Sequence, residues 1–424
     1  TGVEHSFLQL NESQERAVSY SLGESPLTLI QGPPGTGKTQ VIAEICLEML
    51  QSDPNARILV CSETHVAVNN LISRIACLAE QYRVVRIRDR EGDGNIDVFS
   101  PEFIIHEYLT WLASTCTDVT SARIINEELS DVTDPSLEKA LALSSNIVGM
   151  TCNRIAAYNF RDASEMFDTV IIDEACKATL PEILAPLLIA RKAVIVGDPM
   201  QLPPVFCSEE REIIDSIEDC NLRDYMYIDE LFKRTDNIIA LDTQYRMVDE
   251  IGTLISTIFY DGTLKSGRHE GGGNCIIWAD YTPTKAWPLT DEIKCDRTRI
   301  YNEDECKVIS KILHENIAGI SPNSSVAVIS PYRAQVSLLR EHIHLDRVTI
   351  DTVDAFQGKE CDTVIFSMTR TSGAYRFIGD KRRLNVALSR ARNKIVIVGD
   401  LAYCSKNPLL SAVASFCTVQ TVVS

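Results

Sequence analysis

The sequence predicts an α/β protein with two parallel sheets in tandem. Short apolar segments alternate with longer segments of helical periodicity, which is typical of strands joined by crossover helices. The alternation is interrupted at 91–140 by an acidic, helix-rich stretch and restarts after about residue 236. We therefore expect a first domain at 1–235, a helical subdomain inserted within it at 91–140, and a second domain at 236–424.

The elements of each domain follow from local signals. The chain is expected to open with a helix that Asn11 caps, with Gln14 three residues on, and that ends at Gly23. An arginine-rich segment at 83–90 is interpreted as a packed strand whose arginines are solvated. The predicted strands are 27–30, 58–61, 84–87, 147–150, 169–172 and 193–196 in the first domain, and 326–329, 348–350, 363–366 and 395–398 in the second.

Composition limits the class of protein. The 424 residues include no apolar run near the roughly 18 that a membrane span needs and no secretory segment at the start, so we expect a soluble protein. Fourteen cysteines without a CxxC pair predict free thiols in a reducing compartment, the cytoplasm or nucleus. The net charge of -18 argues against a general nucleic-acid coat but allows a local basic groove. Because the chain begins at Thr1 and not at methionine, further domains or protein partners are expected outside it.

A glycine-rich segment, GPPGTGKT at 32–39, lies between the first predicted strand and a helical pattern. Glycines let consecutive N–H groups turn toward one anion, and the helix N-terminus adds positive charge. Lys38 is expected to reach the β- and γ-phosphates, and the Thr39 hydroxyl to ligate Mg²⁺. The segment predicts a nucleoside triphosphate site made by Gly32, Pro33, Gly35, Thr36, Gly37, Lys38 and Thr39.

Two acidic residues follow the strand predicted at 169–172. Asp173 is expected at the C-terminal edge of the sheet, where it can hold the same Mg²⁺, and Glu174 is suited to orient and deprotonate an attacking water. Such a pair is also common as an ordinary cap, but the phosphate-binding segment in the same sheet favours the catalytic interpretation. After the next strand, Gln201 in GDPMQLPP could touch the γ-phosphate.

Motifs along nearly the whole chain resemble those of a superfamily 1 helicase of the 5′-to-3′ class, the group with the nonsense-mediated-decay helicase, senataxin and the immunoglobulin μ-binding helicase. They are LNESQ (10–14), GPPGTGKT (32–39), ILVCSETHVAVNNL (58–71), DEA (173–175), GDPMQLPP (197–204), QYRM (244–247), SVAVISPYRAQ (325–335), VDAFQGKECD (353–362) and NVALSRAR (385–392). The resemblance implies two tandem RecA-like domains of the P-loop NTPase fold.

The resemblance also implies roles around ATP. Gln14 would hydrogen-bond the adenine, Tyr245 would stack near the base, and Glu360 would hold the ribose. Arg246 and Arg390 would act as arginine fingers that stabilise charge on the transferred phosphoryl group. Alternatives remain for single residues: Tyr245 could be a core residue, and either arginine could form a surface ion pair.

For nucleic acid, the resemblance implies loop contacts that do not read bases. These contacts would come from Thr64, His65, Thr151, Pro203, Arg333 and Thr352. The implied function is a monomeric motor that hydrolyses ATP to ADP and phosphate and moves 5′ to 3′ on single-stranded DNA or RNA. The choice between DNA and RNA stays open. The alternative is an ATP-controlled nucleic-acid-binding or scaffolding module without productive unwinding.

Some positions depart from the family's pattern. Lys177 stands where relatives usually carry glutamine after the DEA triplet, so water positioning or nucleic-acid coupling is in question. Val248 and Asp249 replace the usual His-Pro after QYRM. The family's small β-barrel normally precedes the adenine motif and is not expected within this chain.

Overall fold

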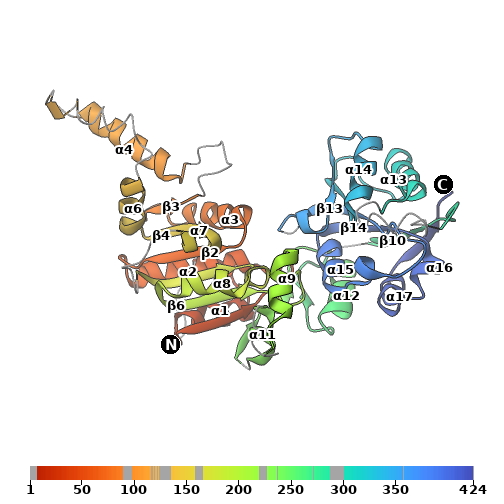
Figure 1. The fold of residues 1–424 in the computed structure, drawn as a ribbon, viewed down its shortest axis with the longest axis horizontal. Coiled ribbons are helices and arrows are strands. Elements are labelled where there is room, and N and C mark those ends of the chain that lie inside the picture. Colours follow the sequence, from red (N-terminus) through yellow and green to blue (C-terminus); the bar gives the residue numbers. More distant parts are fainter. Residues whose placement is uncertain are drawn as a thin grey trace. The chain divides into compact units, whose positions relative to one another are not determined.

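A computed structural model describes residues 7–88, 98–115, 118, 120–121, 123, 135–157, 166–218, 227–235, 237–270, 272–286, 300–356 and 358–423. The chain divides into two compact units. The first comprises Thr1–Gly32, Gly37–Pro199 and Pro203–Leu241, and the second comprises Asp242–Ser424 with two short segments, Pro33–Thr36 and Met200–Leu202. Each unit contains a parallel sheet covered by helices, which confirms the predicted fold class (Figure 1).

The first unit contains a seven-stranded parallel sheet in the order β3-β4-β2-β5-β6-β1-β7. Its strands are β1 (Leu27–Gln31), β2 (Ile58–Ser62), β3 (Val84–Arg86), β4 (Ile147–Thr151), β5 (Phe167–Asp173), β6 (Ala190–Gly197) and β7 (Ile238–Ala240). Six of these were predicted, and β7 was not, because three partly exposed residues at a sheet edge carry almost no periodic signal.

Helices of the first unit cover both faces of this sheet. They are α1 (Glu12–Leu22), α2 (Lys38–Ser52), α3 (His65–Ala76), α4 (Pro101–Thr115), α6 (Pro135–Ser144), α7 (Cys152–Ala157), α8 (Leu180–Leu187), α9 (Ser208–Asp215) and α11 (Asp229–Arg234), with a 3₁₀ turn at Ala175–Lys177. The predicted capping box at Asn11 and Gln14 begins α1, and Gly23 ends it. Within the expected insertion, α4 and α6 are helices, and much of the rest of 91–140 lies outside the described residues.

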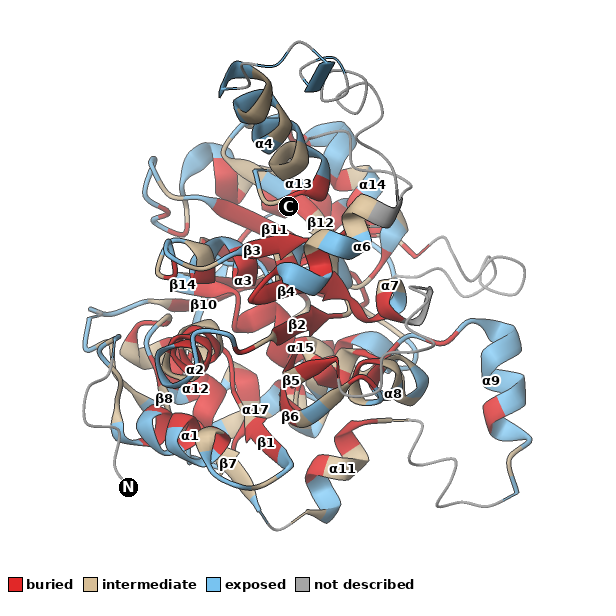
Figure 2. Ribbon diagram, turned by 90° about the vertical axis from the view of Figure 1, so that its left-hand side faces the viewer, coloured by how far each residue is buried: buried red, intermediate tan, exposed pale blue. Residues whose placement is uncertain are grey.

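The core forms because successive residues of a strand point to opposite faces of the sheet. In β2, Ile58 and Val60 pack with residues of α2 and α3, whereas Leu59 and Cys61 join a second cluster on the other face. All five residues of β2 are buried, as expected for a central strand covered on both faces (Figure 2).

The interpretation of 83–90 was wrong for one arginine. Val84, Val85 and Ile87 are packed as expected and Arg83 is exposed, but the side chain of Arg86 is fully buried. Arg90 lies outside the described residues. A buried guanidinium is tolerated only when its donors are satisfied, and that of Arg86 donates to Asn69 and to the Gly149 carbonyl.

The second unit contains a six-stranded parallel sheet in the order β12-β11-β13-β14-β10-β15 and a two-stranded pair, β8-β9. Its strands are β8 (Thr243–Gln244), β9 (Lys265–Ser266), β10 (Ile276–Asp280), β11 (Val326–Ser330), β12 (Val348–Thr352), β13 (Cys361–Ser367), β14 (Ala391–Val398) and β15 (Thr418–Thr421). The four predicted strands are present. β10 was missed although it is apolar, and β15 was missed because it is an exposed edge strand.

The helices of the second unit are α12 (Asp249–Phe259), α13 (Glu303–Glu315), α14 (Arg333–His342), α15 (Lys381–Leu388), α16 (Leu401–Cys404) and α17 (Pro408–Ala414), with 3₁₀ turns at Asp354–Phe356 and Arg376–Gly379. In the part of the chain that the structure describes, no helix combines the length and the apolarity needed to cross a membrane.

Candidate nucleotide and nucleic-acid sites

The loop between β1 and α2 has a backbone that only glycine adopts readily. Gly35 and Gly37 have φ angles of 76° and 78°. A Cβ at Gly37 would lie 2.6 Å from Nε2 of Gln14, and one at Gly35 would lie 2.7 Å from Cβ of Arg246. The Thr36 hydroxyl donates a hydrogen bond of 2.7 Å to the Pro33 carbonyl and tightens the loop. Side chains are therefore excluded from both glycine positions.

This loop leads directly into the N-terminus of α2. Gly37 is the N-cap residue, and no side chain caps the first turn. The first N–H groups of a 15-residue helix therefore present positive charge that a phosphate can neutralise. Nζ of Lys38 donates to the Gly32 carbonyl at 2.9 Å, which holds its ammonium against the loop. The residues present fit the triphosphate that the motif predicts.

Asp173 and Glu174 follow β5 as predicted. Asp173 is 5% exposed and accepts a hydrogen bond of 2.9 Å from the backbone N–H of Glu174. Burial and then the nearby charge of Glu174 raise the pKa of Asp173 to about 7, although Lys38 acts to lower it. Oε1 of Glu174 lies 3.7 Å from Nζ of Lys38. Two close carboxylates, one of them buried, fit a cation, and hydroxyl and carboxylate oxygens are ligands that Mg²⁺ accepts.

Glu174 has an uncommon backbone conformation. Its φ is 52°, in the left-handed region, and it precedes the 3₁₀ turn Ala175–Lys177. Such a conformation costs about 1 to 3 kcal/mol for a residue other than glycine and is enriched at functional sites. The turn sends the chain away from the strand end directly after the two carboxylates.

Arg390, in the second unit, is buried, and its guanidinium forms several hydrogen bonds. It is 3% exposed, and its guanidinium donates to the carbonyl of Val386 at 2.9 Å and to that of Lys359 at 3.3 Å. Nη2 also donates to Oε1 of Gln201 at 3.1 Å, within the segment Met200–Leu202 that belongs to this unit. Arg390 is therefore not a surface ion pair, and it is held beside the residue that was predicted to sense the γ-phosphate.

Arg246 is held by two groups of the same unit. Its Nε lies 2.6 Å from Oε2 of Glu360, and its Nη1 donates to the Ser389 carbonyl at 3.1 Å. Burial acts to raise the pKa of Glu360, but Arg246 and Arg392 outweigh it and keep the pKa below its usual value. Glu360, predicted to hold the ribose, is thus an ionised partner of Arg246 in this structure.

Gln14 and Tyr245 occupy different environments. Gln14 is buried, and its Oε1 accepts the Asn11 N–H at 2.9 Å in the capping box. Tyr245 is 45% exposed, so it is not a core residue. Its backbone N–H donates to the Gly35 carbonyl at 2.9 Å, which fixes its main chain beside the glycine-rich loop segment of the second unit.

The candidates for nucleic-acid contact in the first unit lie at the C-terminal edge of its sheet. Thr64 caps α3, and His65 is its first residue. Thr151 ends β4 and is buried, and its hydroxyl accepts the Arg154 N–H at 3.2 Å. Ser62 of β2 pairs with Thr151, so the loops after these two strands are neighbours. Pro203 follows β6 and is half-buried.

The candidates for nucleic-acid contact in the second unit also lie at the C-terminal edge of its sheet. Arg333 is exposed at the first position of α14, and Thr352 ends β12 with a partly exposed side chain. The residue before the β11–α14 loop, Ser330, pairs with Thr352. Both candidates are therefore accessible and near each other at one edge of the sheet.

Three further side-chain contacts near the C-terminal edge of the first sheet were not predicted. Nη2 of Arg86 lies 3.1 Å from Nδ1 of His65, and Nε donates to Oδ1 of Asn69 at 2.9 Å. Nζ of Lys177 lies 3.5 Å from Oε2 of Glu63. The sequence singled out the arginine-rich segment and Lys177 but could not reveal these contacts, because the partners lie at or after the ends of different strands.

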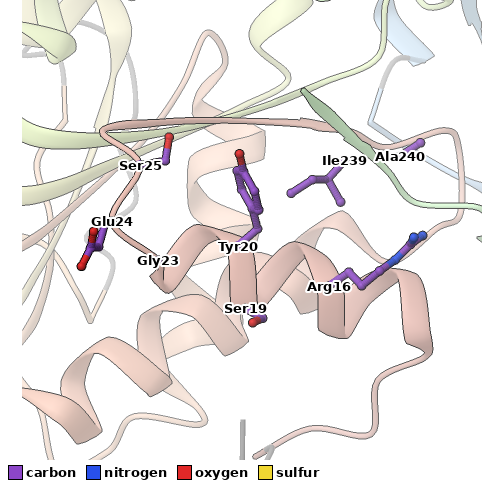
Figure 3. Close-up of a pocket in the computed structure, with 8 residues that line it drawn as sticks. All are labelled: Arg16, Ser19, Tyr20, Gly23, Glu24, Ser25, Ile239 and Ala240. Carbon is purple, nitrogen blue, oxygen red and sulfur yellow. The ribbon is translucent and has the colours of Figure 1, made fainter. Parts of the chain in front are cut away.

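A surface pocket of about 580 Å³ lies between α1 and β7 (Figure 3). Arg16, Tyr20 and Ile239 are among its lining residues, and none of the predicted site residues lines it. The pocket therefore does not extend the nucleotide site.

Comparison with known proteins agrees with these features. Two families, each described as an AAA domain, match residues 9–108 with 112–209, and residues 224–402. DNA polymerase alpha-associated DNA helicase A of Saccharomyces cerevisiae is 29% identical over 96% of this chain and 68% of its own length. The regulator of nonsense transcripts 1 homolog of Arabidopsis thaliana is 30% identical over 95% of this chain and 33% of its own length.

The ATP-dependent helicase NAM7 of Saccharomyces cerevisiae is 29% identical over 95% of this chain and 43% of its own length. A crystal structure of arterivirus nonstructural protein 10, a helicase, is 14% identical, with a TM-score of 0.47 over 96% of this chain and 64% of that one. The chain thus spans between a third and about two thirds of the length of these proteins.

The phosphate-binding loop, the acidic pair and the parallel sheets are the features of a P-loop NTPase. Within that class, the chain belongs to the superfamily 1 ATP-dependent helicases, in the group that contains the regulators of nonsense transcripts.

Proposed function

We propose that the chain is the motor of a helicase or translocase that hydrolyses ATP to ADP and phosphate and moves 5′ to 3′ along single-stranded DNA or RNA. One observation carries the proposal. The strained Glu174, the buried Asp173 and the ammonium of Lys38 meet beside a glycine loop at one sheet edge. This is the arrangement needed to hold a triphosphate and activate water. Membership of the helicase family supports nucleic acid as the partner.

Each residue of the first unit has a proposed task. Mg²⁺, when bound, would be held by Thr39 and Asp173 and would neutralise charge on the phosphates. Lys38 would bind the β- and γ-phosphates as a point charge, and the loop N–H groups would orient them. Glu174 would hold the attacking water and accept its proton. Its contact with Lys38 keeps the carboxylate in place before substrate binds.

The second unit is proposed to supply the remaining groups. Arg390 and Arg246 would stabilise charge on the transferred phosphoryl group, and Gln201, fixed by Arg390, would report the γ-phosphate. Tyr245 would stack near the base and Glu360 would hold the ribose, while Gln14 would bind the adenine edge. Glu360 must then exchange part of its contact with Arg246 for the ribose.

Single-stranded nucleic acid is proposed to contact Thr64, His65, Thr151, Pro203, Arg333 and Thr352. The exposed Arg333 suits a phosphate, and small hydroxyls suit sequence-independent contact. A buried hydroxyl such as that of Thr151 would need its loop to shift for direct contact. We further propose a monomeric motor that works with domains or partners beyond this chain in a reducing compartment. The eleven cysteines within the described ranges, all free thiols, support that compartment.

The test is the ATPase rate with and without matched single-stranded DNA and RNA oligomers. We expect stimulation by at least one of them, and unwinding of a duplex with a 5′ overhang but not of one with a 3′ overhang. A negligible rate under all conditions contradicts the motor. ATP-dependent binding of the oligomers without turnover would instead favour the binding or scaffolding module.

A further inference from the structure

Two aromatic rings meet at the C-terminal edge of the second sheet. Tyr332 follows β11, and Phe377 lies in the 3₁₀ turn after β13. Their ring centroids are 6.1 Å apart at an interplanar angle of 77°, which is an edge-to-face contact. Tyr332 is 6% exposed, whereas Phe377 is 44% exposed. The buried ring therefore supports the exposed one from the side.

Arginines surround these two rings. The guanidinium carbon of Arg383 lies 4.5 Å from the centroid of Phe377, and that of Arg370 lies 5.5 Å from the centroid of Tyr332. Nε of Arg370 also donates to the Tyr332 hydroxyl at 2.7 Å. Arg376, directly before Phe377, is exposed. Both rings are thus fixed by packing on cations, at cation–π distances.

The charges at this place are mainly positive. Burial raises the pKa of Tyr332, and the guanidinium groups of Arg370, Arg376 and Arg383 act in the opposite direction. A carboxylate also faces the cluster: Oδ2 of Asp380 lies 3.3 Å from Nη1 of Arg383 and holds that arginine against the Phe377 ring. On a chain with a net charge of -18, a local group of arginines around an exposed ring is unusual.

The cluster lies at the same edge as the proposed nucleic-acid contacts of this unit. Arg333 is the residue after Tyr332, and Ser330 pairs with Thr352 in the register of β11 and β12. β11 also pairs with β13, after which the chain continues to Phe377. A strand of nucleic acid whose phosphates contact Arg333 therefore passes near the exposed ring.

We propose that Phe377 is a stacking platform for one unpaired base of the bound single strand, with Arg376 contacting an adjacent phosphate. The inference rests on the proposed function and adds a base-stacking subsite to it. An exposed phenyl ring backed by a guanidinium offers a rigid apolar face, and base–aromatic stacking tolerates any sequence. Arg383 holds the ring through its ion pair and cation–π contact, so it acts as a positioning residue.

The test measures binding of the whole chain to a fluorescent oligothymidine by anisotropy, and to the same oligomer with every base replaced by an abasic site. Phe377→Ala should weaken binding to the intact oligomer about 5- to 150-fold, the range for one lost stack. Phe377→Trp should restore it, and Phe377→Leu, which keeps bulk without an aromatic face, should not. Tyr20→Ala, which removes a similarly exposed aromatic (43%) from the first unit, should bind like the wild type.

The abasic oligomer separates stacking from a structural role. The wild type should lose more affinity than Phe377→Ala when the bases are removed, because the variant has no stack left to lose. Equal losses in the two proteins, or wild-type affinity in Phe377→Ala, would overturn the inference while leaving the proposed function intact. If the wild type binds neither DNA nor RNA oligomers, the proposed function itself fails.

Discussion

Nη2 of Arg86 lies 3.1 Å from Nδ1 of His65. A guanidinium can only donate, so Nδ1 is the acceptor and the ring proton of a neutral His65 resides on Nε2. Arg86 thereby fixes both the tautomer and the orientation of a side chain that is proposed to contact nucleic acid. The same guanidinium donates to Asn69 and, at 3.3 Å, to the Gly149 carbonyl.

Arg86→Met should lower the free energy of unfolding by about 3 kcal/mol, because Asn69 and Gly149 lose a buried donor and each unsatisfied group costs about 1 to 3 kcal/mol. Urea unfolding measures this. Arg83→Met, at an exposed arginine next to the same strand, is the matched control and should change stability by less than about 0.5 kcal/mol. Equal stability of the two variants would show that the buried network contributes little.

Lys38→Ala and Glu174→Gln should each abolish ATP turnover by different routes. Lys38→Ala removes a phosphate ligand, so it should also weaken binding of a fluorescent ATP analogue. Glu174→Gln removes the proton acceptor and should leave analogue binding within a few-fold of the wild type. Loss of a group that acts in the transition state typically costs on the order of 10²-fold or more in rate. Phosphate release and analogue titration test both variants, and a Glu174→Gln variant that still turns over would remove Glu174 from catalysis.

Arg390→Lys should lower kcat by on the order of 10³-fold, since lysine keeps a charge but loses the fork of donors that an arginine finger uses. Arg392→Lys is the matched control two residues on, because Arg392 is 44% exposed and pairs with Glu360 at the surface. Its kcat should stay within a few-fold of the wild type. Thermal unfolding checks that Arg390→Lys remains folded, and similar kcat values for the two variants would contradict the role of Arg390.

Stability should depend on pH through Glu305, a buried residue of α13. Burial raises the pKa of Glu305 to about 8, although hydrogen bonds from Ser367 and the Thr369 N–H oppose the rise. The folded chain therefore holds a proton that the unfolded chain releases above about pH 4.5. The stability due to this group is fully present below that pH and is lost as pH rises through about 8.

Glu305→Gln should remove this dependence. Between about pH 6 and 8, the unfolding free energy of the variant should therefore fall less steeply than that of the wild type, by up to about 1.4 kcal/mol per pH unit. Urea unfolding at several pH values measures the slope. Glu303→Gln, at an exposed glutamate in the same helix turn, should keep the wild-type slope. An unchanged slope in Glu305→Gln would mean that Glu305 is ionised in the folded chain at neutral pH.

The Lys177–Glu63 ion pair connects the loops that follow β5 and β2. The last residues of these two strands, Asp173 and Ser62, are paired in the sheet. Both side chains are partly exposed, at 23% and 30%, so their coupling should be worth less than about 1 kcal/mol. Lys177→Gln should therefore lower the nucleic-acid-stimulated ATPase rate by no more than about fivefold. A double-mutant cycle with Glu63→Gln measures the coupling, and a loss of 100-fold would show that Lys177 acts directly in turnover.

Local signals in the sequence predicted most of the fold. Apolar segments located the six predicted strands of the first unit and four strands of the second, because buried strands of parallel sheets are apolar on both faces. The capping box at Asn11 and the glycines of the phosphate-binding loop were equally readable, since each depends on residues a few positions apart. The roles of the individual site residues remain predictions that the experiments above address.

Contacts between distant segments were decided by the tertiary structure alone. Arg86 has the local pattern of a solvated arginine, yet it is buried at the end of β3, where α3 supplies Asn69 and His65 as partners and β4 supplies the Gly149 carbonyl. Arg246 and Glu360 are 114 residues apart, and their ion pair arises only when the loop before β13 reaches the QYRM segment. The sequence by itself determined the chemistry of the phosphate-binding loop and the order of the strands along the chain. Which charges are buried and which groups satisfy them depends on packing, because burial is a property of neighbours in space and not of neighbours in sequence.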